Sequence, residues 1–401
     1  MTHLPNVQGF LHGFDDVSYD EKRVNMVMMN ELRPKFWRIG MTDKAGLNHI
    51  LAKKVNPNQK ITLVVSDQLA VIKGSYQALK PWENWNAYQQ LVRDLVSLYK
   101  QHNLNIDYWD VWSEPDTTAM WSGSCAQAME TFKRTFEAIR SVDSSAKIVG
   151  PSVSDINSKG ACGDSFFGHF LNYVAEQNLK FDAISWHEFN HPEQLPAQAE
   201  VIRQFFAKHP SLGMPEMHVN EYSGPLDAPI AGWAVGWLYY LEAANLNWAT
   251  RACWGQGCQA GLDWLFTKNT ATTPLYWVHQ SYANLPSMRL RSVTDTPSVV
   301  AMAGKNDAKQ ELSVLVGRFS GKQVFGAAEN VTLVIENFPY HLNSVSYTVK
   351  RIPRTLQPTQ ELVAPIPVSN ENLPVTNSTV TLSLPAFQDG DAYLLSLKAV
   401  Q

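Results

Sequence analysis

Two glutamates stand at the ends of strand-like segments about a hundred residues apart. Glu114 follows the aromatic and β-branched run 107–112 and precedes Pro115, whereas Glu221 follows the run 217–220. Pro115 has no backbone N–H and disfavours helical geometry at Glu114, so we expect Glu114 to be held at the carboxyl end of a strand. In parallel α/β proteins, catalytic residues gather at that edge. The pattern predicts paired carboxylates for acid/base chemistry, as in the cleavage of glycosidic bonds.

A parallel barrel would bring these two carboxylates together. From residue 6 to about residue 285, strand-like segments alternate with segments whose apolar positions recur every three or four residues. Alternation favours a parallel sheet, and eight repeats favour an α/β fold of the closed (β/α)₈ TIM barrel type. The predicted strands are 7–14, 36–40, 61–66, 108–112, 147–153, 181–189, 217–222 and 248–254. The predicted helices include 85–102, 126–142, 165–177, 197–208, 230–245 and 274–285.

The pattern changes after residue 285. Short strand-like segments, separated by turn residues such as Lys305-Asn-Asp307, replace the alternation. We therefore expect a catalytic barrel over residues 1–287 and an accessory antiparallel β-sandwich domain over residues 288–401, packed rigidly against each other. The predicted strands of the sandwich are 298–303, 311–319, 331–335, 344–351, 380–384 and 392–397.

The residues around the two glutamates resemble the active-site motifs of the clan A glycoside hydrolases, most closely the family 39 β-xylosidase and α-L-iduronidase group. In that clan a Trp-Asn-Glu-Pro motif ends strand four, and a second glutamate ends strand seven. Here Trp112-Ser113-Glu114-Pro115 and Asn220-Glu221-Tyr222 occupy those places. Arg38 ending strand two, His187 ending strand six and Trp254 ending strand eight also fit the clan's pattern.

The resemblance implies a retaining glycoside hydrolase that acts on an oligo- or polysaccharide without a cofactor. Glu114 would be the general acid/base and Glu221 the nucleophile. Arg38 would keep Glu221 ionised, and we expect the pKa of Glu114, which has no cation beside it in the sequence, to be raised. Ser113 departs from the clan, which has Asn at this position to contact the sugar 2-hydroxyl. The alternative is a catalytically silent, carbohydrate-binding barrel, in which Ser113 reflects lost turnover.

Further side chains near the predicted strand ends are candidates for contact with a sugar. His12 follows the first strand, and aromatic residues such as Trp121 offer faces on which a sugar ring can stack. Packing within a loop is the alternative for each tryptophan. The predicted substrate-binding residues are Arg38, Ser113, His187, Trp254, His12, Trp121 and Tyr222.

A competing motif overlaps one of these candidates. Residues 187–191 match H-E-x-x-H, a zinc signature that works on a helix, where positions i and i+4 share a face. Here the match follows the predicted strand 181–186, and Pro192 comes directly after it. We therefore predict no metal site, and we expect His187 to be a neutral hydrogen-bonding partner near the nucleophile or the sugar.

Composition narrows the classes of partner. The net charge is −4 and the isoelectric point about 6.3, so no basic field favours nucleic acid or anionic lipid. The longest apolar run, 232–241, is too short to span a bilayer. Nothing in the pattern predicts an oligomeric state.

The four cysteines fall into two local pairs, Cys125 with Cys162 and Cys253 with Cys258. Disulfides and free buried thiols are both compatible with these surroundings. The sequence predicts a secreted or periplasmic protein that starts after a removed leader, with a cytoplasmic location as the alternative.

Overall fold

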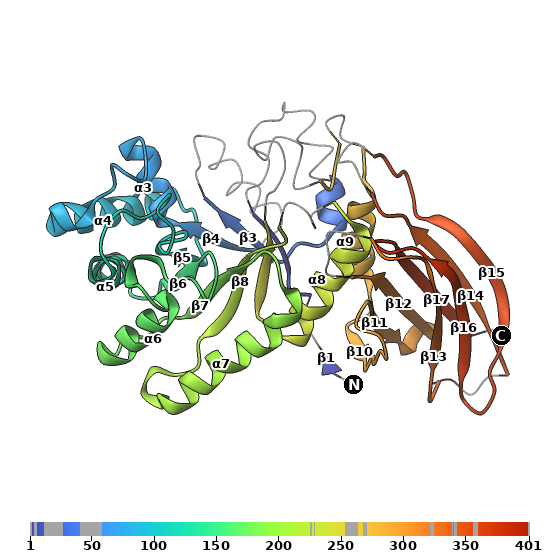
Figure 1. Cartoon of the computed structure of the whole chain (residues 1–401). Helices are drawn as coiled ribbons and strands as arrows, with labels where there is room; N and C mark the ends of the chain where they lie inside the picture. The colour runs from blue at the N-terminus through green and yellow to red at the C-terminus, as the bar shows by residue number, and fades with distance from the viewer. Residues whose placement is uncertain are drawn as a thin grey trace.

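The computed structural model describes most of the chain. The described residues are 2–3, 6–11, 27–40, 58–224, 227, 229–252, 264–267, 271–320, 325–338, 340, 343–355 and 360–399. Within them the chain forms a barrel surrounded by helices and, beside it, a unit built of antiparallel strands (Figure 1).

Eight parallel strands form the barrel, which closes where β2 pairs with β9. The predicted TIM barrel is confirmed, and most strands lie within a few residues of their predicted positions. β6 has the predicted bounds, because its apolar run stands between two clear breaks. The barrel strands are β2 (Gln8–Leu11), β3 (Phe36–Ile39), β4 (Lys60–Val64), β5 (Tyr108–Asp110), β6 (Lys147–Val153), β7 (Ala183–Glu188), β8 (Glu216–Tyr222) and β9 (Trp248–Arg251).

The outer helices follow from apolar periodicity and from caps. The helix at Trp85–Gln101 begins after Asn84, whose side chain accepts from the Ala87 N–H, and it buries a stripe that includes Tyr88 and Val92. The described helices are α3 (Val65–Lys73), α4 (Trp85–Gln101), α5 (Cys125–Val142), α6 (Phe166–Glu176), α7 (Leu195–Lys208), α8 (Ala231–Ala243) and α9 (Pro274–Asn284). The short 3₁₀ turns are η1 (Pro81–Glu83), η2 (Gly160–Cys162), η3 (Pro192–Gln194), η4 (Pro210–Leu212) and η5 (Asp307–Lys309).

The second unit contains two antiparallel sheets that share one core, as the predicted sandwich requires. The strand β1 (Thr2–His3), from the beginning of the chain, pairs with β10 at the edge of the larger sheet. In spatial order the larger sheet contains β1, β10 (Met288–Leu290), β11 (Val299–Asn306), β12 (Glu311–Arg318), β17 (Ala392–Ala399), β14 (Ser344–Ile352) and β15 (Ile366–Pro374). The smaller sheet contains β13 (Glu329–Ile335) and β16 (Val380–Phe387).

Helix α8 joins the barrel to the larger sheet, and Figure 1 shows it between the two. Along β12, Val314 and Val316 belong to the core between the two sheets, whereas Leu315 belongs to a core that it shares with Val235 of α8. The sheet is therefore buried on both faces at this strand. Gly232 allows α8 to lie close to the larger sheet. Its N–H donates to the carbonyl of Gly390 at 2.7 Å.

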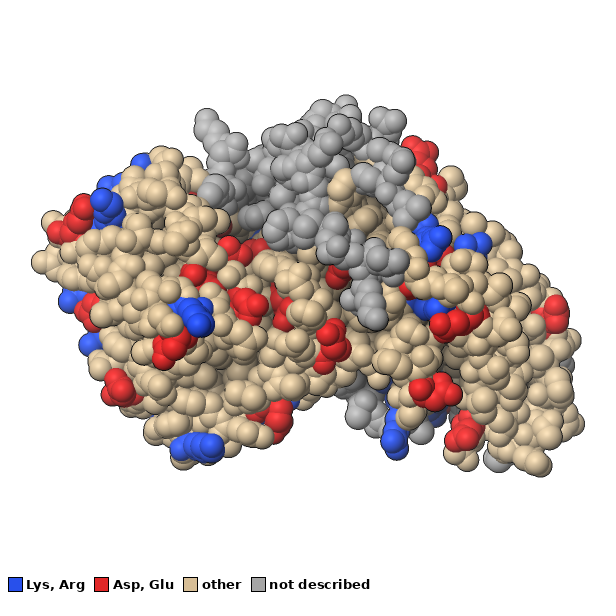
Figure 2. Space-filling model, viewed as in Figure 1, with Lys and Arg blue, Asp and Glu red and all other residues tan. Residues whose placement is uncertain are grey.

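Charge is dispersed over the described part of the face in Figure 2, where Lys and Arg stand scattered among Asp and Glu. This agrees with the absence of a basic field in the composition. Among the described helices, none combines the length and the apolar character that crossing a bilayer requires.

Candidate active site

The two predicted glutamates lie together at the carboxyl ends of the barrel strands. Glu114 follows β5, Glu221 is the second-to-last residue of β8, and His187 is the second-to-last residue of β7. One oxygen of each carboxylate and one nitrogen of His187 all lie within 4.8 Å of one another. Nδ1 of His187 is 3.1 Å from Oε1 of Glu114 and 3.9 Å from Oε2 of Glu221. The barrel thus forms a compact site with two carboxylates and one imidazole.

The guanidinium group of Arg38 holds the carboxylate of Glu221 in position. Its side chain is 1% exposed, and its Nη1 donates to Oε1 of Glu221 at 2.5 Å. Its Nε donates to Asp110 at 2.9 Å, and its Nη2 donates to the Ser113 hydroxyl at 3.1 Å. Each of the three guanidinium nitrogens thus donates a hydrogen bond, in a fork geometry that an ammonium group does not provide. The counter-charge that was predicted for Glu221 is present.

Electrostatics at Glu114 differ from the expectation. Burial acts to raise the pKa of Glu114, but hydrogen bonding and charge from His187, with the charge of Arg38, outweigh it and hold that pKa below its ordinary value. The predicted raised pKa is wrong, because strand β7 places a nitrogen of His187 beside the carboxylate. Burial also acts to lower the pKa of Arg38, but Asp110 and Glu221 overcome it and hold that pKa above its ordinary value.

The backbone at Glu114 also differs from the expectation of an extended residue before proline. Its φ is +49°, in the left-handed region that non-glycine residues rarely adopt. Hydrogen bonds hold it there, since the Glu114 N–H donates to the Ser152 carbonyl at 2.9 Å and the Thr117 N–H donates to the Glu114 carbonyl at 3.0 Å. Strained backbone of this kind gathers at functional sites, where the surrounding structure fixes it.

Several buried polar residues around Arg38 were not predicted from the sequence. Asp110 is fully buried and accepts hydrogen bonds from Arg38, from Asn220 at 2.9 Å and from the Ser152 hydroxyl at 2.7 Å. The available signal was alternation, because Asp110 shares the inward face of β5 with Tyr108, and an acid there needs partners. Its partners come from other strands, so sequence spacing alone does not identify them.

The remaining predicted contacts have different surroundings. Trp121 is 6% exposed, packs edge-on against Trp82 and Trp112, and donates its indole N–H to the Ser124 carbonyl. This burial favours the alternative of packing within a loop, and contact of Trp121 with a sugar stays a prediction. Tyr222 is 1% exposed and packs against Trp237. His12 and Trp254 lie outside the described residues, as do Cys253 and Cys258.

The H-E-x-x-H match does not lie on a helix. His187 is fully buried at the end of β7 and faces Glu114, whereas the side chain of His191 is 58% exposed and pairs with Glu193. Glu188 accepts the backbone N–H groups of Asn190 and His191 and so shapes the turn after the strand. The two histidines therefore belong to different surroundings, as the strand assignment predicted.

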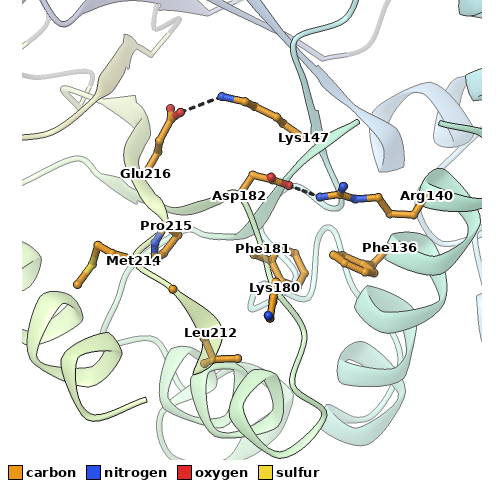
Figure 3. A pocket seen from close by; sticks show the side chains of 11 residues that line it. Phe136, Arg140, Lys147, Lys180, Phe181, Asp182, Leu212, Met214, Pro215 and Glu216 are labelled. Carbon is orange, nitrogen blue, oxygen red and sulfur yellow. Dashed lines mark hydrogen bonds and ion pairs between the residues drawn. The ribbon is translucent and has the colours of Figure 1, made fainter. Parts of the chain in front are cut away.

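A cavity of about 620 Å³ opens at the other end of the barrel (Figure 3). Two ion pairs line it, Lys147 with Glu216 at 3.0 Å and Arg140 with Asp182 at 2.8 Å. Glu216 begins β8, five residues before Glu221, which is roughly 16 Å along a strand. This cavity is therefore separate from the paired carboxylates.

A disulfide lies beside the catalytic face. Cys125, the first residue of α5, is bonded to Cys162 at the end of η2, with 4.8 Å between the Cα atoms. It links the segment after β5, which carries Glu114, to the segment after β6. Of the two states that were left open for this pair, the structure contains the disulfide.

Comparisons with known proteins agree with this arrangement. Residues 60–212, which include Glu114 and His187, match the profile of the family described as "Glycosyl hydrolases family 39". A β-xylosidase from Caldicellulosiruptor saccharolyticus is 24% identical over 119 residues, a match that covers 29% of this chain and 23% of that enzyme. The chain therefore spans less than a quarter of the length of this curated relative.

Solved structures match over nearly the whole chain. A protein named N2152 from Neocallimastix frontalis has a TM-score of 0.80 at 17% identity, and the match covers 100% of this chain and 96% of that chain. A monomeric β-xylosidase from Caulobacter crescentus has a TM-score of 0.69 at 14% identity, with 99% and 96% covered. At these identities the matches establish the fold. Together with the profile match, they show that the chain resembles glycoside hydrolases of family 39.

Proposed function

We propose that this protein is a retaining glycoside hydrolase that cleaves O-glycosidic bonds of an oligo- or polysaccharide by double displacement. Glu221 is the nucleophile, and Glu114 is the general acid in the first step and the general base in the second. The coarser part of the proposal, a glycosidase, is supported by the family 39 profile and by the β-xylosidase relative. The finer part rests on the geometry of the two carboxylates.

The short distance between the carboxylates carries the proposal. One oxygen of Glu114 and one of Glu221 lie within 4.8 Å. Retaining enzymes hold their carboxyl groups roughly 5–5.5 Å apart, whereas inverting enzymes need about 6.5–9.5 Å to accommodate a water molecule. The proximity of the two carboxylates favours the retaining geometry over the inverting one.

The surroundings of the two glutamates support different roles. Arg38 donates to Glu221 at 2.5 Å, so the carboxylate proposed to attack the anomeric carbon has a cation beside it. Glu114 has the imidazole of His187 beside it and no direct hydrogen bond from arginine among the described residues. This difference in partners supports the assignment of proton transfer to Glu114.

Azide rescue of alanine variants tests these roles. Glu221→Ala removes the nucleophile, so azide should attack directly and give a glycosyl azide of inverted configuration. Glu114→Ala should retain the first step with activated aryl glycosides, and azide should then give the retained product. Cleavage of substrates with poor leaving groups should fall by at least about 10²–10⁴-fold in Glu114→Ala. Exchanged outcomes would reverse the assignment, and unchanged activity in either variant would refute the paired-carboxylate mechanism.

The alternative function is a carbohydrate-binding barrel without turnover, for which the replacement of Asn by Ser113 is the motivation. A panel of aryl glycosides that includes β-xylosides, chosen because the relative is a β-xylosidase, separates the two. Binding without release of aglycone by the unmodified protein would favour the silent barrel. A chelator control belongs with this assay, because Glu114, His187 and Glu221 lie close enough to hold a cation. Loss of activity in chelator would contradict the metal-independent mechanism.

We also propose that the protein works in an oxidising compartment, as a secreted or periplasmic enzyme. The Cys125–Cys162 disulfide supports this, because such bonds are rare in the reducing cytosol. Thiol labelling of the protein isolated from its native cell, under denaturing conditions without reductant, tests it. Quantitative labelling of Cys125 and Cys162 would contradict it.

A further inference from the structure

A third carboxyl group lies at the same end of the barrel and has no part in the mechanism above. Helix α3 begins directly after β4, so the first turn of the helix lies at the carboxyl end of the strand. Asp67 lies in that turn and is 5% exposed. A buried acid in this position requires partners, and those partners lead to Glu114.

A chain of hydrogen bonds connects Asp67 to the residue before Glu114. The hydroxyl of Tyr76 and the hydroxyl of Ser66 both donate to Oδ1 of Asp67, the latter at 3.1 Å. The same Ser66 oxygen accepts the backbone N–H of Ser113 at 3.0 Å. Because its one proton is directed to Asp67, Ser66 presents a lone pair to Ser113. The carboxylate of Asp67 therefore sets the direction in which Ser66 hydrogen-bonds.

This chain of hydrogen bonds ends at the Ser113 peptide, next to Glu114, whose backbone has an unfavourable conformation. Glu114 has a φ of +49°, which costs free energy unless neighbouring contacts fix it. Ser66 holds the Ser113 N–H on one side, and the Ser152 carbonyl holds the Glu114 N–H on the other, at 2.9 Å. Loss of the first contact would leave the Ser113 N–H without this acceptor, so that the position of Glu114 would depend on the contacts from Ser152, Thr117 and Arg38 that remain.

The charges around Asp67 connect it to the nucleophile as well. Burial raises the pKa of Asp67 to about 6, and the positive charge of Arg38 and the hydrogen bond from Tyr76 oppose that rise, whereas the charge of Asp110 adds to it. Arg38 thus lies in the field of Asp67, Asp110 and Glu221 together. The ionised form of Asp67 is the form that accepts from both hydroxyls.

We propose that Asp67 is a positioning residue for the acid/base Glu114: it orients the Ser66 hydroxyl, which holds the Ser113 peptide and thereby directs the Glu114 carboxyl. This inference rests on the proposed function. Asp67 acts through Ser66 and does not itself transfer a proton. Its removal should therefore affect steps that need a well-placed acid and should spare steps that do not.

The dependence of cleavage on the leaving group tests this. In Asp67→Ala and in Ser66→Ala, kcat/KM should fall about 10–100-fold for a glycoside with a poor leaving group, part of the loss expected for general acid catalysis. For an activated aryl glycoside, kcat/KM should fall less than about threefold, since little protonation is needed. The double variant should lose no more than either single variant, because the two residues act in series. Asp67→Asn, which keeps the side-chain volume, supplies a milder variant should Asp67→Ala fail to fold.

Tyr88→Phe is the matched control, since Tyr88 is a buried tyrosine whose hydroxyl bonds to Thr135 at 2.7 Å, outside the chain that leads to Glu114. It should leave the leaving-group dependence unchanged. Equal losses for good and poor leaving groups in Asp67→Ala and Ser66→Ala, or additive losses in the double variant, would overturn the inference. Glu114→Ala serves as the reference. If the loss of kcat/KM in Glu114→Ala does not depend on the leaving group, the proposed function fails. If the loss depends on the leaving group in Glu114→Ala but not in Asp67→Ala and Ser66→Ala, only the role of Asp67 fails.

Discussion

At the residue scale, Glu114 faces two opposing demands. A general acid must carry a proton when substrate binds, yet His187 and Arg38 hold the pKa of Glu114 below its ordinary value despite its burial. In the proposed double displacement the conflict would ease once Glu221 is esterified to the sugar, because Glu114 would then act as a base, and a low pKa favours the base form. In that mechanism the imidazole of His187 would adjust the balance between the two steps.

Removal of His187 should change the pH dependence in a definite direction. The hydrogen bond from His187 favours the ionised form of Glu114, so in His187→Ala the pKa of Glu114 rises. Activity is lost at high pH when the acid deprotonates, and the basic limb of the kcat/KM profile should therefore move to higher pH. A pH–rate series on a glycoside with a poor leaving group, whose cleavage needs protonation, measures this. The exposed His191→Ala is the control, and a basic limb that stays in place or moves to lower pH in His187→Ala would contradict the role given to His187.

Some of the site could be predicted from single residues and some could not. Glu114, Glu221, Arg38 and His187 follow strand-like runs, and their positions at strand ends already indicated a shared edge. Asp110 and Asp67 meet their partners only through the register between strands and through the start of α3. The expectation of a raised pKa for Glu114 was wrong for the same reason, because its neighbour His187 comes from a strand that is distant in sequence.

At the element scale, apolar periodicity predicted the barrel strands and six outer helices. It failed where one element runs directly into the next. The run 61–66 was predicted as a strand, but β4 ends at Val64 and α3 begins at Val65 without a break. Strand β15 was missed, because its exposed edge contains Pro367 and polar side chains that do not alternate clearly.

The disulfide between the segments after β5 and β6 should contribute to stability. It closes a loop with a sequence separation of 37 residues, for which the restriction of the unfolded chain is worth about 3–4 kcal/mol. Reduction should lower the denaturant midpoint of the protein by a corresponding amount. The double variant Cys125→Ala, Cys162→Ala is the control, and any effect of reductant that remains in it reports on Cys253 and Cys258. An unchanged midpoint after verified reduction of Cys125 and Cys162 would contradict this contribution.

At the scale of the whole molecule, the barrel and the strands beside it share buried surface. Helix α8 covers the barrel on one side and the larger sheet on the other, and Leu315 of β12 packs into the same core as Val235. The backbones approach so closely at Gly232 that no space is left for a side chain. The two units are expected to unfold together.

A methyl group added at Gly232 should weaken this junction. A Cβ there would lie 2.4 Å from the Asp391 carbonyl and 2.5 Å from the Arg318 carbonyl, and both are backbone atoms. Gly232→Ala should lower the free energy of unfolding by at least about 1–3 kcal/mol, as overpacking does. Calorimetry should show one transition for the unmodified protein and a lower Tm for the variant.

Gly168→Ala is the matched helical control, because a Cβ there meets only the side chain of Ser165, at 3.0 Å. Its effect should be within about 1 kcal/mol, near the helix preference of alanine over glycine. Two separate transitions in the unmodified protein, or equal effects of the two alanines, would show that the units do not depend on each other.

The pairing of β1 with β10 bears on how such a protein can be rearranged in evolution. The larger sheet takes an edge strand from Thr2–His3, ahead of the barrel, and its other strands from after the barrel. A recombination event near residue 288 that joined this sheet to a foreign barrel would remove β1 from its pairing with β10, and it would remove Gly232 of α8 from its contact with Gly390. Inheritance of the two units as one block is therefore favoured, and recombinants with exchanged barrels should be rare among functional descendants.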